Sequence, residues 1–457
     1  MTTFRTALRP PRPTRIQPLG LLAAAVVIAG ATYLISGATR PSSTRPALNR
    51  DESFVLQPGA ADDAGPTDLA AIDAQIQVWS AKAAADARDD ISAGNVAVLY
   101  LGRGRLTGDA ADYERSLAAA DRAVAAYPGS AGTRALKATV LQATHDFTGA
   151  LALAEQVIAE DPRNVDALSV VGDAQLELGR LADAATTYQR IARIQIGPAL
   201  DVRLARLAWL TGDSERAIRL ATKARDEAAA STSSDPSFYE AQLGEMARLS
   251  GDVAVARAAY DAALAIRTTN QLALLGDARL DAFAGDDTAA ITRLQAAAAI
   301  APRPETLALL SDLLARTGDA TGARRAADTI GVIDRLGGTS AQLFDRQILG
   351  FDLDHGLGTR AALDRAIAAA RIRPDAAGLD TVAWAAYRLG DMTTARSESA
   401  KALATGSVDA RILYHAGAIE MQAGDPVVGR ALVRTALSLG PALDPVDREG
   451  AEALLAP

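Results

Sequence analysis

The chain has 457 residues, of which 49% are hydrophobic and only 4% aromatic, and its formal net charge at pH 7 is −8. It contains no cysteine, which excludes disulfides, cysteine-ligated zinc and thiol catalysis. The acidic balance makes it a poor candidate for nucleic-acid binding, which depends on lysine and arginine at the phosphates.

The N-terminus combines a basic segment with an apolar one. Residues 1–18 contain four arginines and no acidic residue, and residues 19–38 carry no charge. Twenty helical residues span about 30 Å, the thickness of the hydrocarbon core of a bilayer. Because basic flanks stay in the cytoplasm, we expect a single-pass transmembrane signal-anchor helix with the later residues extracytoplasmic, at the cell membrane.

A cleaved signal peptide is the alternative. Ser36, Gly37 and Ala38 fit a cleavage site of small residues, and the protein would then be secreted after cleavage near Ala38. The apolar core of a signal peptide usually has about 7–15 residues, so the longer segment here favours the anchor. Both interpretations place the later residues on the same side of the membrane.

Two regions lead from this segment to the rest of the chain. Residues 39–65 are rich in Pro, Ser, Gly, Ala and Asp, a composition typical of a flexible linker. Residues 66–93 are predicted to form a capping helix region, because apolar residues recur on one helical face between Leu69 and Trp79.

Over residues 94–441, a Gly-Asp or similar turn recurs every 33 to 39 residues. Gly tolerates the left-handed conformation that ends a helix, and Asp accepts from the free N–H groups that start the next one. Apolar helical segments flank the turns, so about ten units of two antiparallel helices are predicted. The turns are Gly108-Asp109, His145-Asp146, Gly179-Arg180, Gly212-Asp213, Gly251-Asp252, Gly285-Asp286, Gly318-Asp319, Gly356, Gly390-Asp391 and Gly424-Asp425.

This pattern resembles the tetratricopeptide repeat, a helix–turn–helix unit of about 34 residues. That family places small residues where its two helices cross, as Gly172 and Ala184 stand here, and a bulky residue on the second helix, as Tyr188 does. The resemblance covers roughly residues 66–457, and the last units look like those of exported or membrane-anchored bacterial members. It implies an all-α, right-handed superhelical solenoid of about ten repeats, with residues 442–457 as a C-terminal cap.

In this family the first helix of each unit lines a concave groove for a protein or peptide partner. Some members clamp a partner's C-terminal carboxylate with Lys and Asn, which the matching positions here lack. The aromatic residues are the most distinctive, because aromatic side chains dominate binding hot spots; alternatively, they pack helix on helix. The predicted partner-binding residues are Arg203, Arg206, Trp209, Phe238, Gln242, Arg279, Asp380, Trp384, Tyr387, Tyr414 and His415.

No pattern in the sequence predicts an enzyme. The three histidines lie in different units, and the metalloprotease, phosphate-loop and nucleophile-elbow motifs are all absent. Asp352 and Asp354 begin like a calcium loop, but Gly356 stands where the third ligand belongs. We therefore expect Asp354, His355 and Gly356 to form a variant turn, and no catalytic residue, cofactor or metal.

Together these features predict a membrane-tethered extracytoplasmic scaffold that binds a protein or peptide in its concave groove. The alternative is an accessory or structural subunit of a cell-envelope assembly or transport complex. Such a subunit would use the convex face or the ends of the stack.

Overall fold

The computed structural model describes residues 69–230, 235–356 and 359–456, all of which belong to one compact unit. Within these residues the chain forms 22 α-helices, one short 3-10 helix and no strand, as predicted for a helical solenoid. None of these helices combines the length and the hydropathy that a bilayer crossing needs. The segments 1–18, 19–38 and 39–65 lie outside the described residues, so the anchor and the linker stay predictions.

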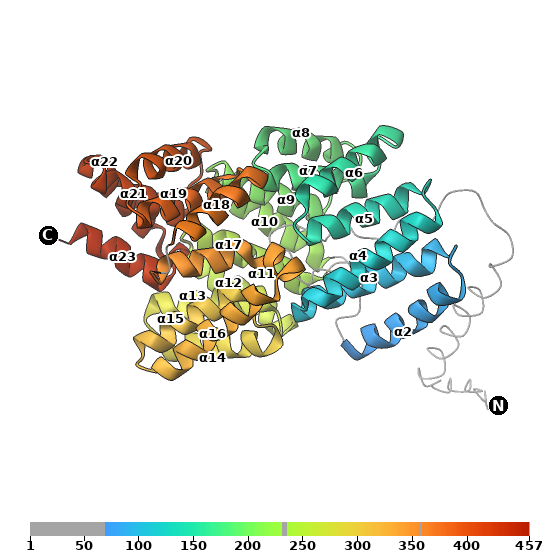
Figure 1. The fold of residues 1–457 in the computed structure, drawn as a ribbon, viewed down its shortest axis with the longest axis horizontal. Helices are drawn as coiled ribbons and strands as arrows, with labels where there is room; N and C mark the ends of the chain where they lie inside the picture. The colour runs from blue at the N-terminus through green and yellow to red at the C-terminus, as the bar shows by residue number, and fades with distance from the viewer. Residues whose placement is uncertain (1–68, 231–234, 357–358, 457) are drawn as a thin grey trace, which may run out of the picture. The chain divides into compact units, whose positions relative to one another are not determined.

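The helices follow one another as ten antiparallel pairs (Figure 1). Helix α2 (Leu69–Ala85) precedes them, and η2 (Gly440–Ala442) and α23 (Pro445–Leu455) follow. The first pair begins at Asp90, inside the region expected to be a cap. The pairs are α3 (Asp90–Thr107) and α4 (Ala110–Ala126), α5 (Ala131–Ala143) and α6 (Phe147–Glu160), α7 (Val165–Glu177) and α8 (Leu181–Ala192), α9 (Pro198–Leu210) and α10 (Ser214–Ala229), α11 (Pro236–Leu249) and α12 (Val253–Ile266), α13 (Gln271–Ala284) and α14 (Asp287–Ile300), α15 (Pro304–Arg316) and α16 (Ala320–Leu336), α17 (Gly338–Asp354) and α18 (Arg360–Ile372), α19 (Ala376–Arg388) and α20 (Met392–Ala404), and α21 (Ala410–Gln422) and α22 (Pro426–Ser438).

The turn within each pair follows from its glycine and aspartate. Gly285 ends α13 in the left-handed conformation, with φ of 85°. The Asp286 carboxylate then accepts the backbone N–H of Ala289 at 3.0 Å and caps α14. His145 takes the same conformation with φ of 64°, alone among the described residues other than glycine. The variant turn at His145 and Asp146 therefore has the same geometry as the Gly-Asp turns.

Glycines at the helix crossings make room for one large ring. Tyr260 on α12 is fully buried and lies between Gly244 on α11 and Gly276 on α13. A Cβ atom at Gly276 would lie 2.1 Å from Tyr260 Cζ, and one at Gly244 would lie 2.6 Å from Cδ1. Neighbouring pairs therefore approach closely only because both positions lack a side chain.

Gly276→Ala should lower the free energy of unfolding by about 1–3 kcal/mol, because the new methyl group must displace a buried ring. Gly102→Ala on α3 is the matched control, since a Cβ there meets nothing within 4 Å. The higher helix propensity of alanine should make that control neutral or stabilising by up to about 1 kcal/mol. Urea unfolding followed by circular dichroism measures both variants, and equal stabilities would contradict the close packing around Tyr260.

The stack of pairs coils back on itself, so that segments nearly two hundred residues apart touch. Arg303 Nη2 donates to the Arg105 carbonyl at 3.0 Å, and Arg248 Nη1 donates to the Pro441 carbonyl at 2.8 Å. The sequence separations are 198 and 193 residues, so one superhelical turn takes about six repeats of about 34 residues. We call α3 to α14 the first superhelical turn and α15 to α23, including η2, the second.

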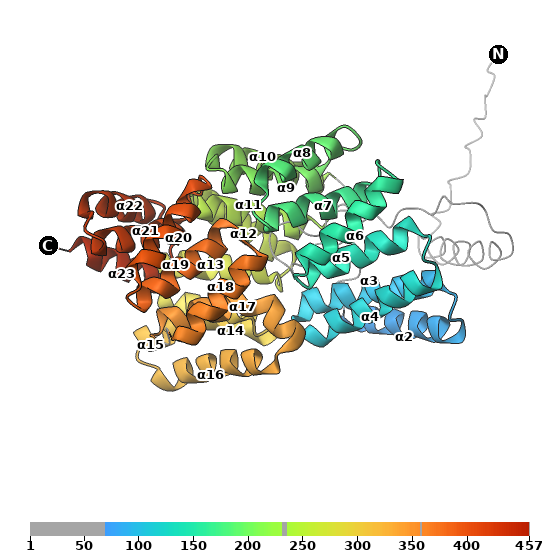
Figure 2. The same ribbon diagram turned by 45° about the horizontal axis from the view of Figure 1, so that its top comes forward.

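The two superhelical turns pack directly on each other at the loops. A Cβ atom at Gly179 would lie 3.1 Å from Asp375 Cα, and one at Gly212 would lie 3.1 Å from the Gly406 carbonyl oxygen. Helix α17 lies beside α4 in both views of the fold, and its Leu343 is buried in the core of the first pairs (Figures 1 and 2). The second turn therefore covers part of the surface on which the partner groove was predicted.

Candidate functional site

The predicted partner-binding residues lie on the first helices of five pairs, but most of them are not at the surface. Only Arg206, Arg279 and Tyr387 of that set are partly exposed. The others are buried, Gln242 completely and Trp384 with 5% of its surface exposed. The buried members are Arg203, Trp209, Phe238, Gln242, Asp380, Trp384, Tyr414 and His415.

The predicted arginines are engaged in ion pairs inside the fold. Arg203 Nε lies 2.9 Å from Asp173 Oδ1 of the preceding pair, and both side chains are buried. Burial raises the pKa of Asp173, although Arg203 opposes that rise. Arg206 pairs in the same way with Glu177, and Arg279 Nε lies 2.8 Å from Asp444 Oδ1. These contacts join adjacent pairs or superhelical turns, so a partner would have to displace them.

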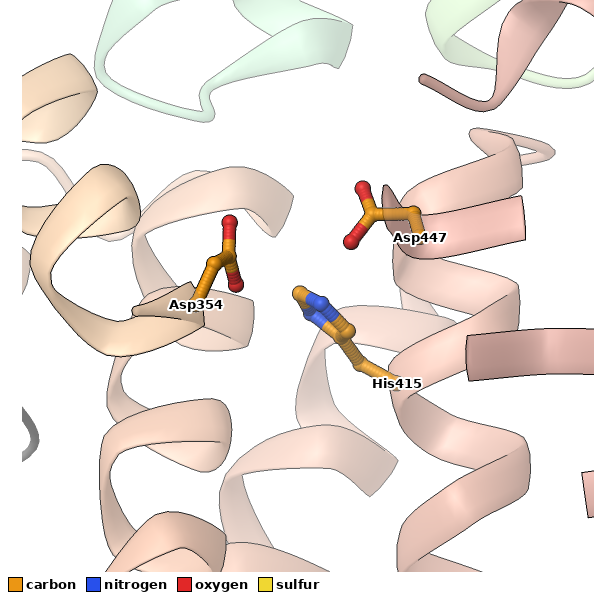
Figure 3. Close-up of side chains that lie close together, drawn as sticks. All are labelled: Asp354, His415 and Asp447. Atoms are coloured by element: carbon orange, nitrogen blue, oxygen red, sulfur yellow. The ribbon is translucent and has the colours of Figure 1, made fainter. Parts of the chain in front are cut away.

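The segment that began like a calcium loop divides its side chains between two places. His355 Nε2 lies 2.7 Å from Asp312 Oδ1, and its Nδ1 lies 2.8 Å from the Phe351 carbonyl oxygen. Asp354 instead faces His415 and Asp447 (Figure 3). Asp354 and His355 thus end α17 as expected, but their side chains contact different repeats.

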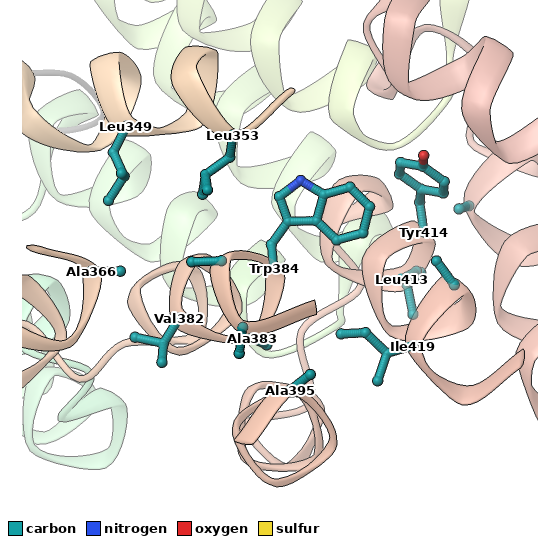
Figure 4. Close-up of a cluster of buried hydrophobic side chains, with 14 of the residues drawn as sticks. Leu349, Leu353, Ala366, Val382, Ala383, Trp384, Ala395, Leu413, Tyr414 and Ile419 are labelled. Carbon is teal, nitrogen blue, oxygen red and sulfur yellow. The ribbon is translucent and has the colours of Figure 1, made fainter. Parts of the chain in front are cut away.

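Of the predicted aromatic residues, Trp384, Tyr387 and Tyr414 pack against one another in the core of the last pairs, where Figure 4 shows Trp384 and Tyr414. The Trp384 ring stacks on His415 with a centroid distance of 3.9 Å and an interplanar angle of 7°. It also stacks on Tyr387 at 4.9 Å and meets Tyr414 at 5.8 Å. The rings thus pack helix on helix, and Tyr387 is the member of this cluster that a partner can reach.

A cavity of about 620 Å³ opens between the two superhelical turns, and we call it the inter-turn cavity. The first turn contributes residues from the loops and ends of α3 to α9. The second contributes the start of α15, the first half of α17 and one side of α18. The lining residues that bear charge or polar nitrogen are His145, Glu177, Arg206, Arg303, Glu305, Gln342, Asp345, Arg346, Gln347, Arg365 and Arg373.

The inter-turn cavity holds five arginines and three carboxylates, in a chain that is acidic as a whole. Glu177 pairs with both Arg206 and Arg373, so one carboxylate serves two guanidinium groups. Burial, together with the nearby charge of Arg346, lowers the pKa of Arg373 despite Glu177. Arg346 also pairs with Asp375, and Arg365 with Asp334 and Asp345, so an anionic group in the cavity would compete with these carboxylates for the guanidinium donors.

His145 lines the same cavity. Its Nδ1 lies 3.2 Å from the Gln342 carbonyl oxygen, across the two superhelical turns. Its Nε2 is buried without a hydrogen-bond partner among the described residues. Burial, reinforced by the charge of Arg373, lowers the pKa of His145 to about 3, so the ring is neutral at pH 7.

The repeat unit is also recognised at the level of sequence. Residues 135–199, which run from α5 into α9, match the family model of the tetratricopeptide repeat. The chain therefore contains a segment that matches the tetratricopeptide repeat. The region that matches contains Glu177 and lies beside the inter-turn cavity.

The solved structures with similar folds share little sequence identity with this chain. The Cut9–Hcn1 hetero-tetramer of the APC/C has a TM-score of 0.37 and 12% identity, over 85% of this chain and 94% of that one. PilW, a type IV pilus biogenesis factor, has a TM-score of 0.37 and 17% identity, over 47% of this chain and 97% of that one. The human IFIT1 dimer with m7Gppp-AAAA has a TM-score of 0.46 and 15% identity, over 81% of this chain and 86% of that one. No curated protein matches the sequence.

The sequence analysis found only one of the cavity arginines, Arg206. Arg303 and Arg373 stand in the linkers between helix pairs, and Arg346 and Arg365 stand on α17 and α18. They face the first superhelical turn only because six repeats of coiling bring them there. No local pattern in the sequence indicates that position.

Proposed function

We propose that this protein is a membrane-tethered extracytoplasmic scaffold of tetratricopeptide repeats that binds a partner protein through an acidic segment held in the inter-turn cavity. The observation that carries the proposal is the cavity itself, with five arginines among its lining residues. The tether rests on the uncharged residues 19–38 behind a basic flank.

The shape and charge of the cavity suit carboxylate side chains. Its volume of about 620 Å³ lies within the range of about 300–1,000 Å³ that is usual for binding pockets. A guanidinium group presents a planar fork of donors that matches a carboxylate, and such charge-assisted bonds are stronger than neutral ones. Arg373 Nε is buried without a hydrogen bond in the described structure, so it has a donor left for a ligand.

Photo-crosslinking from the cavity wall tests this proposal. A photoreactive residue at Gln347, which lines the cavity, should capture a defined partner when the full-length protein is irradiated in its native membrane. The matched position is Ala182, which is exposed on α8 and does not line the cavity. Capture of the same partner from both positions would contradict binding in the cavity.

Arg365→Gln should lower the affinity for the captured partner about tenfold or more, because a charged hydrogen bond contributes about 1.5–3 kcal/mol. Arg365 lies on α18 at the cavity, is partly exposed, and pairs with Asp334 and Asp345, which the partner's carboxylate would replace. Arg360→Gln on the same helix is the control, since Arg360 is mostly exposed and pairs with Asp364 of its own helix. Affinity measured with the purified partner should fall for the first variant and stay constant for the second; equal affinities would refute the role of the arginines.

Protease added to intact cells and to spheroplasts tests the tether. If the orientation is right, the repeats are cut as soon as the protease reaches the extracytoplasmic side of the membrane, and a fragment with residues 1–38 stays with the membrane. Repeats that are protected until the cytoplasm is opened would refute the orientation. Co-purification in fixed stoichiometry with a membrane complex, without capture from Gln347, would favour an accessory subunit instead.

A further inference from the structure

Three side chains from separate parts of the chain converge near its C-terminal end (Figure 3). Asp354 ends α17, His415 lies in the middle of α21, and Asp447 lies in the first turn of α23. One oxygen or nitrogen atom from each side chain lies within 4.8 Å of the others. This group is separate from the inter-turn cavity, so a role for it is independent of the proposed function.

The imidazole of His415 is held in a fixed orientation. Its Nδ1 lies 2.9 Å from Asp380 Oδ2, and its ring stacks on Trp384 at 3.9 Å. The side chain is 2% exposed, and its Nε2 is buried without a hydrogen-bond partner among the described residues. A carboxylate that accepts the Nδ1 proton leaves the Nε2 lone pair free, which is the usual arrangement of a metal-binding histidine.

The two carboxylates are also held in place. Trp384 Nε1 donates to Asp354 Oδ1 at 3.1 Å. Arg411 pairs with Asp354, and its Nε lies 3.3 Å from Asp447 Oδ2. The side chain of Arg411 is 39% exposed overall, although its Nε is buried, so an ion would have to displace a guanidinium that two carboxylates hold. Arg411 therefore occupies a position where the two carboxylates attract a cation.

The charges around Arg411 are out of balance. It interacts with four aspartates, of which Asp444 also pairs with Arg279. Arg248 acts on Asp444 as well, but its own charge is already balanced by Glu245. The four aspartates outnumber Arg411 and Arg279 by two charges, which is the number that a divalent cation supplies. The four aspartates are Asp354, Asp380, Asp444 and Asp447.

We propose that Asp354, His415 and Asp447 form a binding site for a divalent transition-metal ion, with zinc as its probe and Asp380 orienting the imidazole. One imidazole nitrogen and two carboxylate oxygens, completed by water, are a ligand set that zinc accepts. Bonds of about 2.1 Å in tetrahedral geometry put ligand atoms about 3.4 Å apart, so the side chains must close by about 1 Å. The bound ion ties α17 and α21 to the last helix, α23.

Metal titration of the full-length protein tests the site. After treatment with a chelator, the protein should bind one equivalent of zinc in calorimetry. Cobalt bound in place of zinc should give the absorption spectrum typical of an ion with a low coordination number. His415→Gln and Asp447→Asn should each weaken zinc at least tenfold, and Asp380→Asn about 10–100-fold. His355→Gln is the matched control. His355 also pairs with an aspartate, Asp312, but its other ring nitrogen lies against the Phe351 carbonyl oxygen and is not free to bind a metal.

Arg411→Gln separates a metal site from a group of ion pairs. Because Arg411 competes with the ion for Asp354 and Asp447, removing its charge should tighten zinc binding, whereas it should destabilise the metal-free protein. This variant also keeps the test open if His415→Gln fails to fold. No saturable binding to either the unchanged protein or Arg411→Gln, or binding that His415→Gln leaves intact in a folded variant, would overturn the proposal.

Discussion

Replacing Arg248 with alanine should lower the free energy of unfolding by about 3–5 kcal/mol, because it leaves a buried carboxylate without its partner. Arg248 is 4% exposed and donates to both oxygens of Glu245, at 2.7 and 3.0 Å. It also donates to the Pro441 carbonyl of the second superhelical turn at 2.8 Å. The substitution therefore removes an internal ion pair and a contact between the turns together.

Two comparisons make this prediction specific. The double variant Arg248→Met with Glu245→Gln should recover much of the loss, because no unpaired charge remains and Tyr260 keeps an acceptor beside it. Arg219→Ala breaks an exposed pair with Glu215 and should cost less than about 1 kcal/mol. Urea unfolding measures all three, and an equal loss for Arg248→Ala and Arg219→Ala would show that the buried pair is unimportant.

Local chemistry predicted the repeats well. Gly285 and Asp286 end one helix and start the next through interactions within a few residues, so the sequence alone indicates them. The close approach of helices at Gly244 follows equally from the absence of a side chain. These features need no knowledge of the rest of the chain.

The charged residues of the first helices were harder to interpret. Arg203 and Arg206 were predicted to face a partner, but they pair with Asp173 and Glu177 of the preceding repeat. The sequence does contain a signal for this, because acid and base stand 30 residues apart for Asp173 and Arg203 and 29 residues apart for Glu177 and Arg206. A spacing slightly shorter than one repeat places both charges on facing sides of adjacent first helices.

Contacts between superhelical turns could not be predicted in the same way. Whether residue 105 meets residue 303 depends on the small rotation between successive pairs, summed over about six repeats. A slight change in that rotation would separate the turns and remove both the inter-turn cavity and its ring of arginines. The convergence of Asp354, His415 and Asp447 is likewise a property of the assembled stack.

Acidification from pH 4.5 toward pH 2 should destabilise the protein through Glu177 and Glu245. Burial pushes the pKa of Glu177 up, but Arg206 and Arg373 outweigh it and lower the pKa to about 2. Burial is outweighed in the same way at Glu245, where Arg248 lowers the pKa to about 2. Both lie below the ordinary value of 4.5, so the unfolded chain binds protons first as the pH falls. Each carboxylate thus contributes its full stabilisation above pH 4.5, about 3 kcal/mol, and loses it progressively toward pH 2.

Glu177→Gln isolates one of these contributions. The variant should be less stable than the unchanged protein at pH 7, and the difference between the two should shrink as the pH falls from 4.5 toward 2. Because Glu177 joins Arg206 of the first superhelical turn to Arg373 of the second, the same acidification should increase the radius of gyration measured by small-angle X-ray scattering. Glu160→Gln is the matched control, since Glu160 also pairs with an arginine, Arg134, but is mostly exposed. A stability difference for Glu177→Gln that stays constant between pH 7 and pH 2.5 would show that this carboxylate does not couple proton binding to the contact between the turns.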